Sequence, residues 1–193
     1  MSTHPKALVV VDVQDGLDDA QYGPRNNPEA ELRIAELLSA WRSKKWPVIF
    51  SRHNSRRADS PLRQGAPGNR IKPQVAPLSG ELVVEKSVNS IFKADGLIPH
   101  LKKLEISELV FVGIATDACI SASAREAKDL GFSVWVSKDA CATFDRRSMN
   151  GELLPASLVH KVELAILHTA GIHVAATSEI LKQVKIKVPP AHT

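Results

Sequence analysis

Residues 108–131 read ELVFVGIATDACISASAREAKDLG, and this stretch decides the fold. It opens on an apolar run, 109–114, that is typical of a buried strand, and it continues into a helix-like pattern. We predict Thr116 as the N-cap of that helix, which places Cys119 in its first turn, where backbone N–H groups lack intrahelical partners. Those donors and the helix dipole are expected to lower the pKa of the Cys119 thiol and could bind a developing oxyanion. The sequence therefore predicts an elbow in which a strand, a tight turn and a helix present a thiol.

The length and composition predict a single globular domain that spans residues 1–193. A hydrophobic fraction of 44% and a charged fraction of 24% are ordinary for a soluble protein. No apolar run approaches the roughly 20 residues of a membrane span, and the N-terminus lacks the layout of a secretory signal. Cys119 and Cys141 have no disulfide-scaffold spacing, which favours free thiols. We therefore expect a cytoplasmic protein with no membrane partner.

The formal net charge is +4, and much of the basic charge lies in two places. These are the arginine-rich stretch 52–70 and the tail with Lys182, Lys185 and Lys187. A nucleic-acid binder would more often interleave such charges with aromatic side chains, and no such pattern is seen. We therefore expect no nucleic-acid partner and interpret the tail as a solvated surface. For the arginine-rich stretch, a surface role and a role at the site both stay open. The alternating stretch QVKIKV, 183–188, is typical of an edge strand or a swapped arm and points to a homo-oligomer.

Strand-like and helix-like patterns alternate along the whole chain. Apolar runs predict strands at 7–13, 48–50, 82–84, 109–114, 132–136 and 172–176. Helical spacing predicts helices from Pro28 to Trp46, from a cap at Asp95, after Cys119, and over 153–170, with loops at 54–80 and 139–151. The alternation predicts an α/β fold: one doubly wound, mostly parallel six-stranded sheet with helices on both faces, a Rossmann-like three-layer arrangement.

Several reactive side chains fall at the carboxyl ends of the predicted strands. Asp12 ends the first strand, His53 follows the second, Lys86 ends the third, and Cys119 follows the fourth. Because ligands bind beyond these ends in parallel sheets, the four should share one rim. Asp12 could act as general base toward the thiol, with Lys86 offsetting its charge and stabilising the thiolate. The alternative is a structural ion pair between Asp12 and Lys86 beneath an inert buried cysteine.

Four motifs resemble the isochorismatase-like cysteine hydrolase superfamily, over a match from Ala7 to about Leu181. They are VVVDVQ with Asp12, EKSVNSIF with Lys86, GIATDACISASAREAKDLGF with Cys119, and SKDACATFD. The resemblance implies a catalytic triad of Asp12, Lys86 and Cys119 and acyl transfer through a thioester. It also implies a cis peptide bond at Ile114 to Ala115 and an oxyanion hole made by the amides of Ala115 and Cys119. Relatives are commonly dimers or tetramers in which a neighbouring chain can complete the pocket.

The sequence differs from two groups of relatives in residues that decide metal binding and the type of bond cleaved. Nicotinamidases in the superfamily carry an Asp-x-His metal motif after the second strand, where this chain reads Ser51, Arg52 and His53. We therefore predict no metal and no cofactor. His53 is interpreted either as a rim residue that bonds the loop or the substrate, or as a packed histidine. Isochorismatases that cleave a vinyl ether generally lack the cysteine, so Cys119 favours amide hydrolysis.

Candidate substrate contacts flank the predicted triad; they are His53, Arg63, Phe92, Thr116 and Phe144. The loop HNSRRADSPLRQGAPG, 53–68, resembles a subgroup with an H-x-S and then an S-P-L-R-x-G pattern. Arg63 could pair with a substrate carboxylate through both guanidinium nitrogens, or it could brace the loop. The two phenylalanines are interpreted as pocket walls. Cys141 is interpreted as a small buried filler.

The sequence thus predicts a metal-independent cysteine hydrolase that cleaves the C–N bond of a small amide, ureido or carbamoyl compound through a thioester. One alternative is a vinyl ether hydrolase of the isochorismatase type, in which Asp12 is the acid and Cys119 a bystander. Another is a catalytically idle member of the fold that serves as a binding or assembly module. Such a member would lack at least one residue of the triad, and this chain has all three, Asp12, Lys86 and Cys119.

Overall fold

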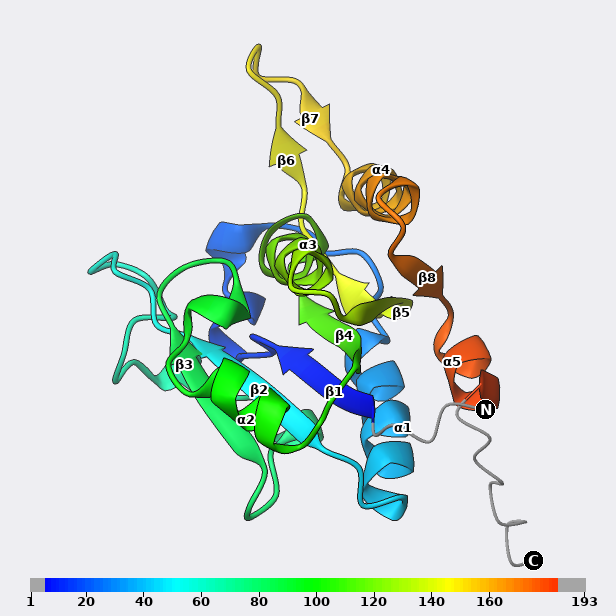
Figure 1. The fold of residues 1–193 in the computed structure, drawn as a ribbon. Coiled ribbons are helices and arrows are strands. Elements are labelled where there is room, and N and C mark those ends of the chain that lie inside the picture. Colours follow the sequence, from blue (N-terminus) through cyan, green and yellow to red (C-terminus); the bar gives the residue numbers. More distant parts are fainter. Residues whose placement is uncertain (1–5, 184–193) are drawn as a thin grey trace, which may run out of the picture.

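A computed structural model describes residues 6–183, and within them a six-stranded parallel sheet forms the centre of the fold (Figure 1). Its strand order is β3-β2-β1-β4-β5-β8. The strands are β1 (Lys6–Val11), β2 (Val48–His53), β3 (Leu82–Lys86), β4 (Glu108–Ile114), β5 (Ser133–Ala142) and β8 (His173–Ala175). All five neighbouring pairs are parallel. The predicted six-stranded α/β sheet is confirmed.

Helices cover both faces of the sheet, which explains why its strands are apolar on both sides. The helices are α1 (Ala30–Ser43), α2 (Leu97–Lys103), α3 (Ser121–Asp129), α4 (Ala156–Thr169) and α5 (Thr177–Gln183). Val9 and Val11 of β1 point into a core shared with α2, α3 and α4. Leu8 and Val10 point the other way, into a core shared with α1 and α5. The alternating direction of side chains along one strand thus fills two separate cores.

The strand order changes direction between β1 and β4, whose carboxyl ends lie side by side. The chain runs outward from β1 through β2 to β3 and then returns to place β4 on the other side of β1. Such a reversal is where open α/β sheets bind ligands. At this point β4 lies so close to β1 that a Cβ on Gly113, whose φ is +128°, would collide with the carbonyl oxygen of Val11. Glycine at 113 therefore permits the close approach of the two strands at which the order reverses.

The long loop 54–80 is held to the body by buried polar side chains. It carries two short 3-10 helices, Pro67–Asn69 and Pro73–Val75. The Asn69 side-chain amide donates to the carbonyl oxygens of His53 and Leu62, at 2.9 and 2.8 Å. The Gln14 side chain donates to the Asn69 carbonyl oxygen at 2.9 Å. The segment that lacked a predicted periodicity is thus ordered by these side-chain bonds together with an isolated antiparallel bridge between Gln14 and Ile71.

An ion cluster fastens the same loop to α1. Lys72 is buried and donates to Asp18 at 2.6 Å and to Glu31 at 2.8 Å. Arg25 reaches both carboxylate oxygens of Glu31, at 2.7 and 2.8 Å. Burial by itself would raise the pKa of Glu31, but the hydrogen bonds from Arg25 and Lys72 lower it to about 2. The Glu31 carboxylate is therefore a charged anchor of the fold at neutral pH.

Several predicted boundaries are wrong. Asp95 does not cap α2, because Gly96, with φ of 81°, occupies the cap position. Residues predicted to start a helix at 153 instead form strand β7 (Leu153–Leu154), which pairs with β6 (Arg146–Arg147) in a hairpin that projects from the body (Figure 1). Pro155 then precedes α4. The arm predicted at 183–188 lies, beyond Gln183, outside the described residues.

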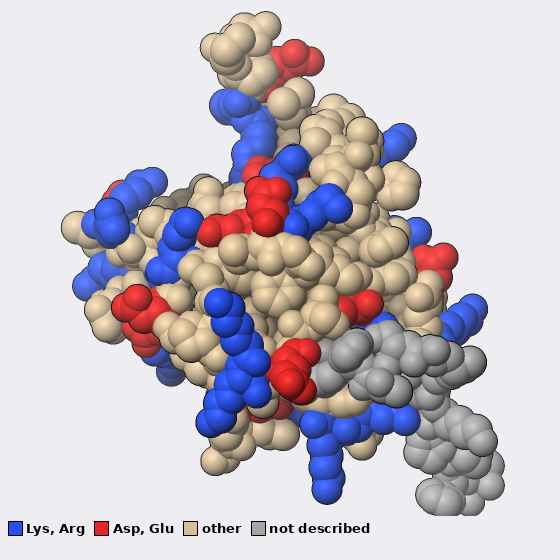
Figure 2. Space-filling view, viewed as in Figure 1, with Lys and Arg blue, Asp and Glu red and all other residues tan. Residues whose placement is uncertain are grey.

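The surface of the described residues shows no dominant charged patch on the face drawn in Figure 2, where acidic and basic side chains are interspersed. An apolar stripe does run along the outer face of α4; it consists of the exposed side chains Leu158, Val162 and Ile166. Within residues 6–183, no helix has both the length and the apolar character needed to span a membrane.

Candidate active site

The turn after β4 carries Cys119 in a different backbone conformation from the one predicted. β4 ends at Ile114, and the peptide bond from Ile114 to Ala115 is cis, as the resemblance implied. One turn of π-helix, Thr116–Ile120, then leads into α3. Thr116 is the first residue of this turn instead of its cap, and Ala115 precedes it. Among the described residues, the hydrogen bonds include none donated by the Ala115 N–H.

Asp12, Lys86 and Cys119 come together at the carboxyl end of the sheet. The Lys86 ammonium donates to Asp12 Oδ2 and lies 3.3 Å from Cys119 Sγ. It donates a further bond to the carbonyl oxygen of Val88 at 3.2 Å. All three side chains are buried or nearly so, and only 9% of Cys119 is exposed. A carboxylate, an ammonium and a thiol thus form one contact group at the ends of three strands.

Asp12 is held by a partner that sequence reasoning missed. Its φ of 52° lies in the left-handed region, which is uncommon for a residue other than glycine. Ser51 donates its hydroxyl to Asp12 Oδ1 at 2.6 Å, and the Asp12 N–H donates to the Ser51 carbonyl oxygen at 3.2 Å. Ser51 pairs with Val11, the last residue of β1, so its side chain lies beside Asp12, which follows that strand. The available signal was a polar serine directly after the apolar run 48–50.

The expectation of a lowered thiol pKa is wrong. Burial, followed by the negative charge of Asp12, raises the pKa of the Cys119 thiol to about 12, while Lys86 opposes the rise. Desolvation of a thiolate costs more here than the nearby ammonium recovers, because Asp12 already neutralises that ammonium. Cys119 therefore rests as a neutral thiol beside an ion pair.

His53 lies close enough to join the triad residues in a possible metal-binding group. Ligand atoms of Asp12, His53 and Cys119 all lie within 4.8 Å of one another. However, the Lys86 ammonium already contacts both Asp12 and Cys119, and a divalent cation would have to displace it. These side chains are therefore better suited to contact the Lys86 ammonium than to bind a metal ion.

The His53 side chain is half-buried, and burial lowers its pKa below the ordinary value. Its Nδ1 is buried and has no hydrogen-bond partner among the described residues. Its backbone is fixed, since its N–H donates to Gln14 Oε1 at 2.8 Å. The imidazole thus lies next to the triad with one buried nitrogen that no described residue bonds.

The other predicted substrate contacts lie in different surroundings. Arg63 is exposed on the loop 54–80. Phe92 is buried against Phe132, with ring centroids 6.1 Å apart. Phe144 is buried in a cluster with Ile114 that Ala115 packs against.

Thr116 is fully buried, and its hydroxyl bonds His160 Nδ1 at 2.8 Å. The opposite ring nitrogen of His160 lies 2.8 Å from the Lys138 carbonyl oxygen. Thr116 thus ties the turn to α4 and β5 instead of presenting a free hydroxyl. His160 was not singled out from the sequence, where a histidine within a helical pattern carried no signal.

Comparison with known proteins places the fold and the motifs in one family. The family model for the Isochorismatase domain matches residues 6–154. The chain belongs to the isochorismatase family. It is 36% identical over 176 residues to the isochorismatase family protein YrdC of Bacillus subtilis, covering 91% of this chain and 94% of that protein.

Two further relatives of this isochorismatase-family chain bear on its function and fold. Nicotinamidase 3 of Arabidopsis thaliana is 30% identical over 170 residues, covering 80% of this chain and 79% of the relative. A crystal structure of an isochorismatase-family protein from Chromobacterium violaceum superposes with a TM-score of 0.89 at 39% identity, covering 95% and 94% of the two chains. The predicted isochorismatase-like hydrolase fold is confirmed.

Proposed function

We propose that this isochorismatase-family hydrolase is a metal-independent cysteine amidohydrolase acting on a small amide, ureido or carbamoyl compound. The observation that carries the proposal is the contact group of Asp12, Lys86 and Cys119, in which Lys86 touches both of the others. A thiol nucleophile needs a base within reach, and the Asp12 carboxylate is the buried base beside it. The relative named as a nicotinamidase supports an amide as the substrate class.

In the first half of the reaction, Cys119 Sγ attacks the carbonyl carbon while its proton passes to Asp12. The carbonyl oxygen becomes an oxyanion, which the amides of Ala115 and Cys119 stabilise. The Ala115 N–H, unused by other described residues, supports this role. Asp12 then gives the proton to the departing nitrogen, the C–N bond breaks, and an amine or ammonia leaves a thioester on Cys119.

In the second half, water attacks the thioester carbon and gives a proton to Asp12. The C–S bond breaks, the acid leaves, and Asp12 returns the proton to the sulfur. Each turnover consumes one water and restores the resting state, so the balance closes without a further reactant. Lys86 stays protonated throughout and offsets the negative charge wherever it resides.

No step requires a metal ion, because the ammonium of Lys86 supplies the positive charge at the position between Asp12 and Cys119. We expect activity to be unchanged after exhaustive treatment with a chelator. A loss of activity that added Zn²⁺ restores would contradict the metal-independent mechanism.

An ammonia-release screen over nicotinamide, small aliphatic amides and ureido acids tests the proposal, with Cys119→Ala as the blank. We expect turnover by the parental protein and none by the variant, with unchanged thermal unfolding. Mass spectrometry of the quenched reaction should show an acyl adduct on Cys119. Turnover by Cys119→Ala at the parental rate would show that the thiol is not the nucleophile and would overturn the proposed mechanism.

A further inference from the structure

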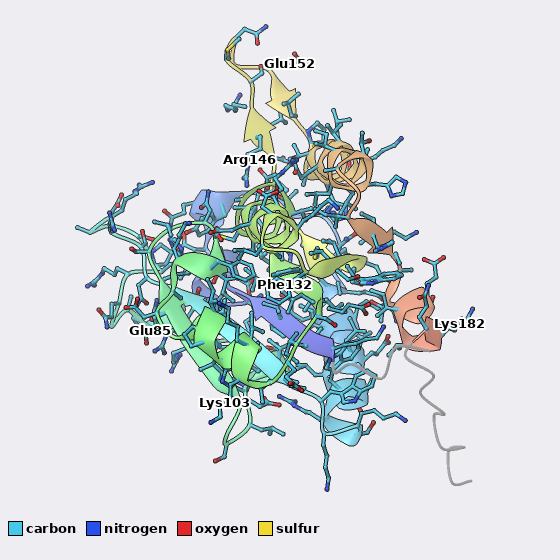
Figure 3. The ribbon with its side chains drawn as sticks, viewed as in Figure 1. Glu85, Lys103, Phe132, Arg146, Glu152 and Lys182 are labelled. Atoms are coloured by element: carbon cyan, nitrogen blue, oxygen red, sulfur yellow. The ribbon has the colours of Figure 1, made fainter. Side chains whose placement is uncertain are left out.

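A polar cluster joins the β6–β7 hairpin to the turn that carries Cys119. Asp117 is the second residue of that turn, and Arg146 is the first residue of β6. Arg146 donates from Nε to Asp117 Oδ2 at 2.7 Å and from Nη2 to Oδ1 at 3.1 Å. The Thr143 hydroxyl donates to the same Oδ1. Figure 3 shows Arg146 where the hairpin leaves the body of the molecule, beside α3.

The segment that presents Arg146 is fixed from two sides. The Thr143 N–H donates to Asn26 Oδ1 at 2.7 Å, and the Asp145 N–H donates to the Pro24 carbonyl oxygen at 3.1 Å. Asp145 in turn accepts a bond from the Ala156 N–H, at the start of α4, at 2.7 Å. The guanidinium therefore projects from a braced segment and can act as a fixed anchor.

The same segment also packs against the residue that precedes the turn. Phe144 is buried in the cluster that contains Ile114 and against which Ala115 packs. The Arg146 guanidinium carbon lies 6.0 Å from the centre of the Phe144 ring. Thus Phe144 packs where Ala115 enters the π-helical turn, and Arg146, through Asp117, holds the part of the turn that leads to Cys119.

We propose that Asp117 and Arg146 are positioning residues for acylation, an inference that rests on the proposed function. Neither needs to touch the reacting atoms. The two-pronged contact fixes a π-helical turn whose backbone has to aim two amides, those of Ala115 and Cys119, at one oxygen. Arg146 also offsets the Asp117 carboxylate, a negative charge two residues from the position where a second negative charge develops.

Substitutions at 146 separate this role from general support of the fold. Arg146→Met removes the charge and both hydrogen bonds to Asp117, along with weaker bonds to Asp145 and Thr143, whereas Arg146→Lys keeps the charge but loses the planar two-pronged donor. Arg147→Met is the matched control, because Arg147 belongs to the same strand but donates to Gly151 within the hairpin. Asp117→Asn, which keeps the side-chain shape, provides a second test from the other partner.

The assay compares two reactions of the same thiol. p-Nitrophenyl acetate acylates Cys119 through an oxyanion, whereas iodoacetamide alkylates it by displacement at carbon without one. For Arg146→Met we expect the acylation rate constant to fall about a hundredfold, the scale of a misplaced catalytic group, while the alkylation rate stays parental. Arg146→Lys should be intermediate, Asp117→Asn should shift in the same direction, and Arg147→Met should be parental in both reactions.

Two results would overturn the inference alone: equal acylation by Arg146→Met and Arg147→Met, or a parallel loss of acylation and alkylation in Arg146→Met. The second would show that the whole site has loosened. If Arg146→Met does not fold, the same comparison is made with Asp117→Asn. A parental protein that is not acylated at Cys119 would overturn the proposed function and this inference with it.

Discussion

Replacing Lys86 by methionine tests whether the centre of the site is a true buried ion pair. Methionine keeps the linear shape of the side chain and removes the ammonium. Asp12 is 2% exposed and Lys86 4% exposed, so solvent cannot take over the lost contact. Breaking a buried pair by removing one partner costs about 3 to 5 kcal/mol, because the other charge is left uncompensated. We therefore expect Lys86→Met to be folded but strongly destabilised.

For a chain of this size, that loss corresponds to a fall in melting temperature of about 6 to 20 °C. The loss of the bond from the Lys86 ammonium to the Val88 carbonyl oxygen contributes about 1.5 to 3 kcal/mol, the scale for a hydrogen bond that involves a charged group, and does not reach the upper part of the expected range. Denaturant unfolding followed by tryptophan fluorescence measures the change directly, since Trp41 is fully buried in the core beneath the sheet.

Lys93→Met is the matched control. Lys93 also contacts a carboxylate, Glu126 at 2.6 Å, but its side chain is 63% exposed, so its removal should cost at most about 1 kcal/mol. The double variant Asp12→Asn/Lys86→Met should be less destabilised than the sum of its single variants, because it removes both charges. If Lys86→Met were no less stable than Lys93→Met, the buried ion pair would not exist as described.

Three further outcomes are expected. Asp12→Asn should abolish hydrolysis yet speed alkylation of Cys119 at neutral pH, because the Asp12 charge raises the thiol pKa and Lys86 lowers it; slower alkylation would contradict this. Since the pKa of Glu31 is about 2, against an ordinary 4.5, its contribution to stability is complete above pH 4.5 and is lost as the pH falls toward 2. Glu31→Gln should therefore lose roughly 3 kcal/mol of unfolding free energy at neutral pH and flatten the acid-unfolding curve; an unchanged curve would refute the shift. The expected homo-oligomer should exceed the single-chain 21.0 kDa in light scattering, and Val162→Lys in the α4 stripe should lower the mass; a parental monomer would contradict it.

The sheet could be predicted because its signal is local. Apolar runs bounded by loops identify strands that are buried on both faces, and their alternation with helices leaves few topologies. The boundaries were less accurate where tertiary contacts decide them. β5 continues through the polar stretch SKDACA to Ala142, because Cys141 and Ala142 pair with the end of β4. Nothing in the periodicity of 137–142 required a strand.

Asp12, Lys86 and Cys119 could be predicted as neighbours because each lies at or shortly after the carboxyl end of a parallel strand, and these ends meet at one edge of the sheet. Their role as a triad followed from the family resemblance. The polar residues that hold these three in place could not be predicted from the sequence. Arg146 and Asp117 are separated by 29 positions, and Ser51 and Asp12 by 39. Which distant polar residue satisfies a buried carboxylate depends on packing that no periodic pattern records. The predicted direction of the Cys119 pKa shift was wrong for a related reason. The prediction considered the free N–H donors of the helix and left out the burial of the thiol.

A neutral resting thiol changes the part that Lys86 has to play. In the proposed reaction, Asp12 carries the negative charge before proton transfer and the sulfur carries it afterwards. The Lys86 ammonium contacts Asp12 Oδ2 and Cys119 Sγ at once. The negative charge therefore moves between two atoms that both touch the same ammonium. The net charge of the buried group stays constant, and the group needs no rearrangement to stabilise the thiolate. A thiol with a lowered pKa would instead hold a permanent negative charge beside Asp12, and the two anions would compete for one ammonium. In the proposed reaction, burial thus keeps the sulfur protonated in the resting enzyme.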